Sequence, residues 1–421
     1  MRVIGMMSGT SCDAIDAAAA ELAVDDGVLR LTPLGMVSRP YPPGLQDLLL
    51  RALAPDGAVT TGEVCRLDTL IGRAFAETAV LADRELCGGT AGLVASHGQT
   101  VYHWAEDGRV HGTLQLGQPA WIAEATGRPV VADFRPRDIA AGGQGAPLVS
   151  LVDLLWLRGR PGVPVALNVG GIANLTALPA GGPPVAFDTG PGNTLIDTAV
   201  RELTGGRLGH DVDGRIAAAG ECDERLLDVL LAEPYYRLPP PKTTGRELFH
   251  GGHLRAALAA AGLPGPSPDV VATLTLLTAR TVARAVHPLG ATEVILSGGG
   301  SRNPVLTARL RRELGATALR TSDELGLPAQ AKEAYAFAVL GFLTLLGLPG
   351  NAPPCTGASG PRVLGSLTPG RHPLRLPPAV RAEPRALVVT PAGTAPRGPG
   401  PAPGSRPTGP GTRRPPAGPP R

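Results

Sequence analysis

The feature that most constrains the fold is an order of segments that occurs twice along the chain. Residues 2–7 are apolar, residues 8–13 (SGTSCD) are small and polar, and residues 14–22 are apolar again. Residues 163–167 and the NVGGIANLT segment that follows repeat this order of strand, polar turn and strand. The two copies share the order of their predicted secondary-structure elements but not their amino-acid residues. The pattern predicts two related α/β domains that face each other across a cleft.

Periodic apolar segments predict the remaining elements. Helical spacing of apolar residues is found at 41–53, 60–86, 119–126, 194–204 and 269–286, and an apolar helix opens at Pro328 and extends to residue 346. Short apolar runs predict further strands at 92–95, 129–132, 184–187 and 294–296. We expect an N-terminal domain over residues 1–145 and a C-terminal domain over residues 146–370. Residues 371–421 are dominated by Pro, Gly, Ala and Arg, which predicts a disordered tail.

The charge distribution argues against nucleic acid as a partner. The tail holds nine arginines and one acid, a local charge of +8 within a total of +3, which leaves −5 on residues 1–370. A groove that binds nucleic acid needs a net positive charge. The five cysteines are scattered and form no C-x-x-C pair, which indicates a reducing compartment and no structural zinc. We find no membrane span and no export signal and therefore expect a cytoplasmic protein.

The segment AFDTGPGN at residues 186–193 concentrates the candidate chemistry. An apolar approach and a helical pattern after it predict that Asp188 lies where a strand gives way to a helix, at the ligand-binding edge of the sheet. Backbone N–H groups at the start of a helix favour an anion there. A carboxylate at this place suits a general base or a water-mediated metal contact. Ordinary turn and capping roles for Asp188 and Asn193 are an alternative.

Three further polar segments follow predicted strands in the N-terminal half. The turn at residues 8–13 suits a phosphate tail with Asp13 beside a magnesium ion, although plain hairpin turns have the same composition. His97 lies in the loop SHGQT, where a substrate contact and a structural histidine are both open. Arg135 and Asp138 belong to ADFRPRDIAAGGQGAP, which suits recognition of a carboxylate or a sugar, with a salt-bridged loop as the alternative.

Two features of the C-terminal half add to this set. Gly298, Gly299 and Gly300 follow a predicted strand, and their bare backbone suits a flat base and its ribose. Glycine triplets also occur in plain loops. Glu333 is in the first turn of the apolar helix, where it either faces the substrate or compensates the helix dipole.

Seven segments, taken in order, resemble the anhydro-N-acetylmuramic acid kinases of bacterial peptidoglycan recycling: GMMSGTSCDAID, SHGQTVYH, ADFRPRDIAAGGQGAPLV, NVGGIANLT, FDTGPGN, SGGGSRNP and LPAQAKEAYAF. The resemblance extends from residue 3 to about residue 368. It implies an actin/hexokinase-like ATPase fold with ATP and sugar between two domains. It also implies a reaction in which ATP and Mg²⁺ serve to open the 1,6-anhydro bond with water and to phosphorylate O6. The products would be N-acetylmuramate 6-phosphate and ADP, and the family habit is a homodimer.

The resemblance implies individual roles as well. Asp188 matches the base, Asp13 the magnesium neighbour, and Glu333 a glutamate near the sugar. His97, Arg135 and Asp138 fall on sugar-side segments. The implied ATP-binding residues are Gly9, Thr10, Ser11, Cys12, Asp13, Ala14, Ile15, Asp16, Gly298, Gly299 and Gly300. Ala14 is a departure, because the family often has glycine there.

Two alternatives come from other functional classes. One is a different phosphotransferase or phosphatase on the same fold, such as a relative of acetate kinase or exopolyphosphatase. The segment RPRDIAAGGQGAP argues against it, since that segment belongs to the muramate kinases and not to the fold. The other is an actin-like or sugar-sensing module that binds nucleotide without turnover. Such a module would have no use for Asp188 as a base.

Overall fold

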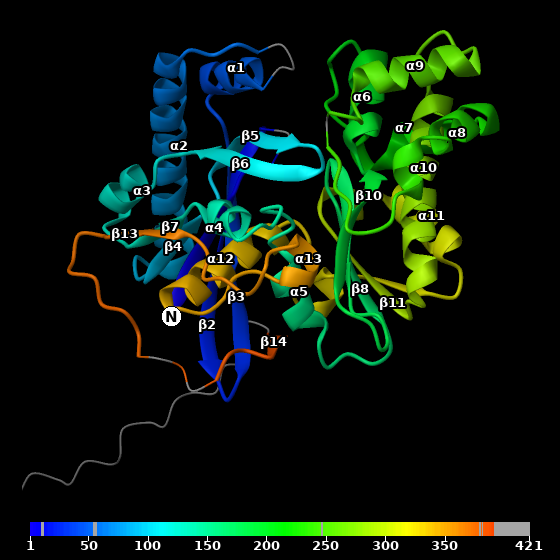
Figure 1. Cartoon of the computed structure of the whole chain (residues 1–421). Helices are drawn as coiled ribbons and strands as arrows, with labels where there is room; N and C mark the ends of the chain where they lie inside the picture. The colour runs from blue at the N-terminus through cyan, green and yellow to red at the C-terminus, as the bar shows by residue number, and fades with distance from the viewer. Residues whose placement is uncertain (10–11, 54–56, 246, 379, 381, 391–421) are drawn as a thin grey trace, which may run out of the picture.

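The structure is a computed structural model that describes residues 1–9, 12–53, 57–245, 247–378, 380 and 382–390. Within them, two mixed β-sheets lie side by side with helices packed against both (Figure 1). The first sheet has the order β13 (Ser366–Thr368), β7 (Val130–Ala132), β4 (Leu93–Ser96), β1 (Arg2–Met7), β2 (Ala14–Asp25), β3 (Val28–Pro40) and β14 (Ala386–Val389). The second has the order β10 (Val185–Pro191), β9 (Ile172–Ala177), β8 (Pro164–Val169), β11 (Glu293–Ser297) and β12 (Ala318–Thr321). A hairpin of β5 (Gln99–Glu106) and β6 (Arg109–Leu116) stands apart from both.

The strand order confirms the duplication expected from the sequence. The order β3-β2-β1-β4-β7 in the first sheet corresponds to β10-β9-β8-β11-β12 in the second. In both sheets the first three strands are antiparallel and the last two run parallel to the central one. Two related α/β units are therefore present, as predicted.

The predicted helices are also present, and the last one differs most, because it begins at Lys332 rather than Pro328. The helices are α1 (Pro43–Ala52), α2 (Thr61–Cys87), α3 (Pro119–Thr126), α4 (Phe134–Ala140), α5 (Ser150–Leu157), α6 (Thr194–Leu203), α7 (Arg215–Ala219), α8 (Glu224–Leu231), α9 (Gly251–Ala261), α10 (Pro268–Val286), α11 (Pro304–Leu314), α12 (Lys332–Leu345) and α13 (Pro353–Thr356). Among the described residues, none of the helices is long and apolar enough to cross a membrane.

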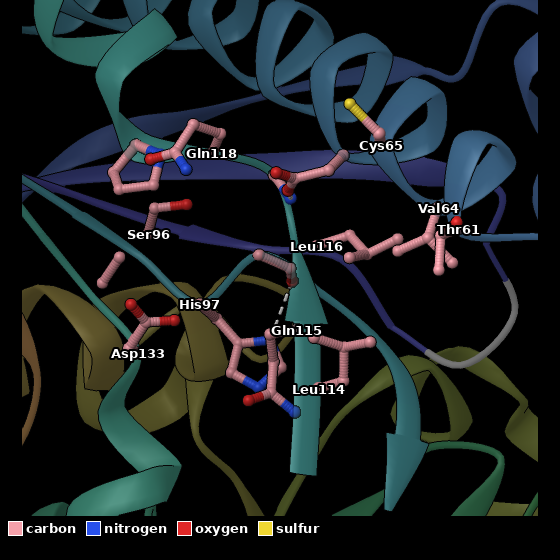
Figure 2. Close-up of a pocket in the computed structure, with 15 residues that line it drawn as sticks. Thr61, Val64, Cys65, Ser96, His97, Leu114, Gln115, Leu116, Gln118 and Asp133 are labelled. Atoms are coloured by element: carbon pink, nitrogen blue, oxygen red, sulfur yellow. Dashed lines mark hydrogen bonds between the residues drawn. The ribbon is translucent and has the colours of Figure 1, made fainter.

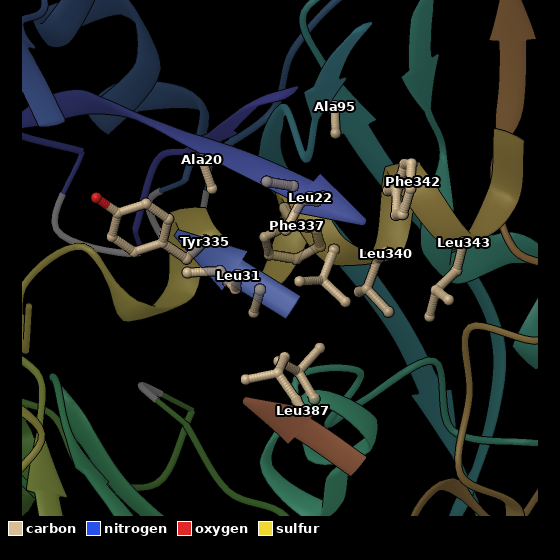
Figure 3. Packing of buried hydrophobic residues seen from close by; sticks show 14 of the residues in the cluster. Ala20, Leu22, Leu31, Ala95, Tyr335, Phe337, Leu340, Phe342, Leu343 and Leu387 are labelled. Atoms are coloured by element: carbon tan, nitrogen blue, oxygen red, sulfur yellow. The ribbon is translucent and has the colours of Figure 1, made fainter. Parts of the chain in front are cut away.

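Alternating residues of the first sheet feed two separate cores, as the period of a strand requires. Ile4 and Met6 pack with α2 on one face, whereas Val3 packs with α12 on the other. Figure 3 shows the α12 side, where Tyr335 and Phe337 lie among residues of β2 and β3. The same core includes residues of α5 and of the second sheet, so it joins the two halves.

Helix α12 corrects the expected domain boundary. It lies on β1, β2 and β4, so it belongs with the first sheet and not with a C-terminal domain that ends at residue 370. The contact is close, because a side chain on Gly5 of β1 would overlap the Ala334 backbone of α12. Strand β13 also pairs in the first sheet. An apolar helix is recognisable as buried from its sequence, but the pattern does not say which sheet buries it.

The expectation of disorder throughout residues 371–421 is wrong for β14. This strand pairs in parallel with β3 at the edge of the first sheet, and Leu387 is buried in the shared core. Its ends are fixed by the N–H groups of Arg385 and Thr390, which donate to Gly27 and Leu31 at 2.7 and 2.9 Å. A four-residue strand inside a Pro- and Arg-rich segment gives too short an apolar pattern to be predicted.

A chain that ends at residue 384 should be less stable than the full chain. It would lose β14, and burial of a leucine side chain such as Leu387 is worth about 1.5–3 kcal/mol. It would also leave the β3 edge unpaired. Urea unfolding measures the difference, and a chain that ends at residue 390 is the control, since it keeps β14. Equal midpoints for the two truncated chains would contradict a stabilising role for this strand.

Candidate active site

Asp188 lies within β10, three residues before the strand ends, and not at the strand end that the sequence predicts. The pairing of β10 with β9 shifts register between Asp188 and Gly190, and this irregularity breaks the ladder beside the carboxylate. The Asp188 Oδ2 atom accepts a hydrogen bond from the Thr244 N–H at 2.9 Å. A loop from outside the second sheet therefore fixes one carboxylate oxygen.

The surroundings of Asp188 favour its protonated form. The pKa of Asp188 is raised to about 7, chiefly by burial and also by the nearby Glu247, while the Thr244 hydrogen bond and Lys242 act to lower it. A carboxylate whose pKa lies near neutrality matches a general base that works near neutral pH. The geometry therefore gives Asp188 a property that an ordinary turn or cap residue does not have.

The half-buried Arg135 and the buried His97 form a pair in the first half. The Arg135 Nε–H donates to His97 Nε2 at 3.0 Å, and Arg135 Nη1 donates to the Gly145 carbonyl oxygen at 2.7 Å. The His97 Nδ1–H donates to the Gly98 carbonyl oxygen at 2.9 Å, so both ring nitrogens are occupied. Burial, and then Arg135, hold the pKa of His97 well below its usual value. His97 thus supports Arg135 as a neutral ring. Neither of its ring nitrogens is left to bind a sugar hydroxyl directly.

Asp138 was expected to contact the substrate, but it lies inside the protein. It is fully buried, and its Oδ1 atom accepts hydrogen bonds from Asn351 at 2.7 Å and Thr356 at 2.8 Å. Its Oδ2 atom accepts from the Gly145 N–H at 2.8 Å, and a side chain on Gly143 would collide with it. Asp138 therefore shapes the glycine-rich loop and does not face the solvent. The letters RPRD could not show this, because the partners come from near residue 350.

Glu333 and Arg135 lie near enough to influence each other's charge, a proximity that the sequence did not predict. Burial raises the pKa of Glu333, and Asp153 and Asp16 raise it further, while Lys332 and Arg135 oppose them. Burial lowers the pKa of Arg135 to about 10, against the influence of Glu333 and Asp138. Arg135 and Glu333 are thus opposite charges in one partly enclosed region.

The predicted phosphate loop connects β1 to β2, and residues from outside it contribute most of its described hydrogen bonds. Gln99 reaches it from β5, accepting from Ser8 Oγ at 2.7 Å and donating to the Gly9 carbonyl oxygen at 3.3 Å. The side chains of Cys12 and Ile15 are buried in the α2 core, so only their backbone can meet a nucleotide. Thr10 and Ser11 lie outside the described residues. Asp16 is near Asp13, and burial raises the pKa of Asp16.

The glycine triplet, Gly298 to Gly300, packs against β8 of the second sheet. Side chains on Gly298 and Gly300 would overlap β8 at Val169, so these two glycines allow close packing. Gly299 is exposed and lies near the Asn193 side chain, which is at the start of α6. The Asn193 N–H in turn donates to the Gly170 carbonyl oxygen at 2.8 Å. Three glycine-containing turns that are distant in sequence thus converge on one end of the second sheet.

The structure adds residues that the sequence did not single out. His103 of β5 is affected by both halves: burial and Arg135 lower its pKa, while Gln144 and Glu247 raise it. Glu247, Lys242 and Thr244 come from the loop before α9 that surrounds Asp188. The segment PKTTGRE that holds them carries no strand or helix pattern, and this is why it was missed.

Two pockets flank α4, which carries Arg135. Figure 2 shows the first, of about 410 Å³, with His97 and Gln115 at its centre, Ser96 and Asp133 on one side and Thr61 of α2 on the other. The second, of about 530 Å³, lies between the β5–β6 hairpin and α4. Asp188 lines neither of them. Arg135 lines neither of them either, although Asp133 on one side of it in sequence and Pro136 on the other line one pocket each.

Comparisons with known proteins agree with one another on the family. The family model described as anhydro-N-acetylmuramic acid kinase matches residues 1–370. A relative of that name from Streptomyces avermitilis is 69% identical over 92% of this chain and 100% of its own length. Another from Streptomyces coelicolor is 60% identical over 92% of this chain and 99% of its own. Among solved structures, a ROK family glucokinase from Streptomyces griseus covers 82% of this chain and 99% of its own, with 14% identity and a TM-score of 0.34, which is too low to carry an argument.

Proposed function

The chain belongs to the anhydro-N-acetylmuramic acid kinase family, and we propose that Asp188 is the base of its reaction. The protein is a kinase that uses ATP, and its substrate is anhydro-N-acetylmuramic acid of peptidoglycan recycling. The observation that carries the proposal for Asp188 is a partly enclosed carboxyl group that the Thr244 N–H orients and whose pKa burial raises to about 7. A base of this kind can take the proton of a water that attacks the anomeric carbon.

The reaction that the family resemblance implies can be assigned to these groups. Water adds to the anomeric carbon and gives its proton to Asp188, and the bond from that carbon to O6 breaks. O6 then attacks the γ-phosphorus of ATP, the bond from that phosphorus to the bridging oxygen breaks, and ADP leaves. Arg135 is the cation on the sugar side, held by His97 and Gly145, and it suits the carboxylate that muramic acid carries. Glu333 lies near Arg135, where it can accept a hydrogen bond from a sugar hydroxyl.

Magnesium is part of the proposal. Asp13 and Asp16 are neighbouring carboxylates at the predicted phosphate loop, and Mg²⁺ is commonly held by one or two carboxylates together with waters and phosphates. Among the described residues, no group of three or more His, Cys, Asp or Glu side chains could hold a metal ion. When bound, the ion neutralises charge on the transferred phosphoryl group.

The test of this function is ADP release from ATP and Mg²⁺ with and without anhydro-N-acetylmuramate. We expect ADP only when the sugar is present, together with a 6-phosphorylated muramate. Glucose is the control sugar, because it has a free O6 and no anhydro bond. ADP release that is the same with either sugar, or with none, would overturn the proposal.

The activity should rise with pH through about 7. Asp188 must be ionised to accept a proton, and burial raises its pKa to about 7, so the base is lost as the pH falls below that value. The measurement is kcat/KM between pH 5 and pH 9, with a stability check at each pH. A profile that is flat across pH 7, or that falls as the pH rises through 7, would contradict this role.

Two further proposals rest on the family resemblance alone. The protein is expected to form a homodimer, which light scattering of the purified chain measures. It is also expected in the cytoplasm, which fractionation of the cells that produce it measures. A monomer, or enrichment in another fraction, would contradict the respective proposal.

A further inference from the structure

Lysine is almost absent from this chain, and both copies lie beside carboxylates of the proposed reaction. Of 39 lysines and arginines, only Lys242 and Lys332 are lysines. Lys332 precedes Glu333 in α12, and the backbone of Lys242 contacts Asp188. Arginine and lysine differ in shape and in how readily they lose charge on burial. The contacts of Lys242 can therefore be compared with those that a guanidinium group would make in its place.

Lys242 belongs to a closed ring of hydrogen bonds that passes through Asp188. The Asp188 N–H donates to the Lys242 carbonyl oxygen at 3.1 Å. The Lys242 ammonium donates to the Tyr235 carbonyl oxygen at 3.1 Å and to that of Tyr236 at 3.2 Å. The Tyr235 hydroxyl then donates to the Asp188 carbonyl oxygen at 2.8 Å, which closes the ring. Both backbone polar groups of Asp188 are thus held by residues that lie outside the second sheet.

The ammonium group fits this ring better than a guanidinium would. Its nitrogen lies 4.7 Å from the centre of the Tyr235 ring, above the aromatic face, while it donates to two carbonyl oxygens. A compact cation with three donors can serve all three partners at once, whereas the planar fork of arginine is larger and is matched to carboxylates. The hydrogen-bonded residues are also closely packed where Tyr236 meets β10, since a side chain on Gly190 would collide with Tyr236.

The charge of Lys242 acts on the same carboxylate. Burial lowers the pKa of Lys242 and Asp188 raises it, while Lys242 lowers the pKa of Asp188 against burial and Glu247. The groups that face Asp188 are therefore one cation, one further carboxylate and the Thr244 N–H. Removing the cation would leave Glu247 as the only charge among the described residues named beside Asp188.

We propose that Lys242 is a positioning residue for the base. It anchors the backbone of Asp188 through the closed ring of hydrogen bonds that includes Tyr235, and it supplies the positive charge that favours the ionised carboxylate. This inference rests on the proposed function. The two parts of the role can be separated. The hydrogen bonds set where the carboxylate lies, and the charge sets the pH at which it works.

Three variants separate them: Lys242→Met, Lys242→Arg and Tyr235→Phe. Lys242→Met should move the rise of kcat/KM to higher pH by on the order of half a unit to one unit, because an opposite charge is lost. Its kcat at high pH should also fall. Lys242→Arg keeps the charge, so its profile should stay in place while kcat falls. Tyr235→Phe keeps charge and ring and removes only one hydrogen bond, so it should lower kcat without moving the profile.

The control variant is Arg255→Met, which removes one positive charge from the exposed Arg255–Glu202 pair of the same half. Its profile should match that of the unaltered protein. If Lys242→Met gives the unaltered profile and kcat, the inference is overturned while the proposed function stands. If the unaltered protein shows no sugar-dependent ADP release, the proposed function fails first. Should Lys242→Met fail to fold, an unchanged kcat in both Lys242→Arg and Tyr235→Phe overturns the inference.

Discussion

Asp188→Asn should leave ATP binding intact and reduce sugar-dependent turnover by roughly 10²- to 10⁴-fold, the range that a general base contributes. The asparagine amide cannot take the proton of the attacking water. Its oxygen can still accept the Thr244 N–H, and the backbone contacts of residue 188 do not depend on the side chain. The measurement is kcat for ADP release, together with nucleotide affinity by titration calorimetry.

A stability control separates lost chemistry from lost structure. Because the folded-state pKa of Asp188 is raised to about 7, stability that is present at low pH is lost as the pH rises through that value. Asparagine does not ionise, so at pH 8 the variant should be at least as stable as the unaltered protein. Near-normal turnover in a stable variant would remove Asp188 from the mechanism.

Lys332→Met should destabilise the protein by about 3–5 kcal/mol, the usual cost of leaving one member of a buried ion pair alone. Lys332 Nζ lies 2.7 Å from Asp153 Oδ1, and the two side chains are only 4% and 7% exposed. The pair joins α12 of the first half to α5, which packs between the two sheets. Urea unfolding at pH 7 measures the loss.

A second change should reverse most of this loss. The double variant Lys332→Met with Asp153→Leu replaces the pair by apolar side chains, and such replacements of buried pairs are often neutral or stabilising. The matched control is Arg255→Met, whose exposed pair is worth at most about 1 kcal/mol. A Lys332→Met protein as stable as the control would show that the pair is not needed. A double variant as unstable as the single one would show that charge was not the reason.

The two sheets were predictable because their signals are local. Strand β1, the polar turn and strand β2 follow one another in the chain, and so do β8, its turn and β9. The repeated order therefore predicted two related units, and the strand orders agree. What joins the halves was not predictable. The destination of α12, the pairing of β14 and the shared core depend on residues that meet only in the folded chain.

The candidate site divides in the same way. Asp188, Arg135 and Glu333 were singled out because each has a polar or charged side chain next to a recognisable element, and the structure surrounds each with charged groups. Asp138 was misread, since only the Asn351 and Thr356 contacts reveal that it faces inward. Lys242 was not singled out from the sequence as a site residue. Lys242 contacts Asp188 although the two are 54 positions apart in the sequence, and periodic sequence patterns do not predict contacts over such a separation.

The placement of α12 has a consequence for how the chain matures on the ribosome. Strands β1, β2 and β3 leave the ribosome first, but the helix that covers one of their faces and the β14 strand that completes their sheet are made last. Residues of the second sheet with α10 and α11 form a contiguous stretch with a core of its own. We therefore expect the second half to fold while the first is still incomplete, so the nascent chain displays an uncovered apolar sheet face until α12 has been made.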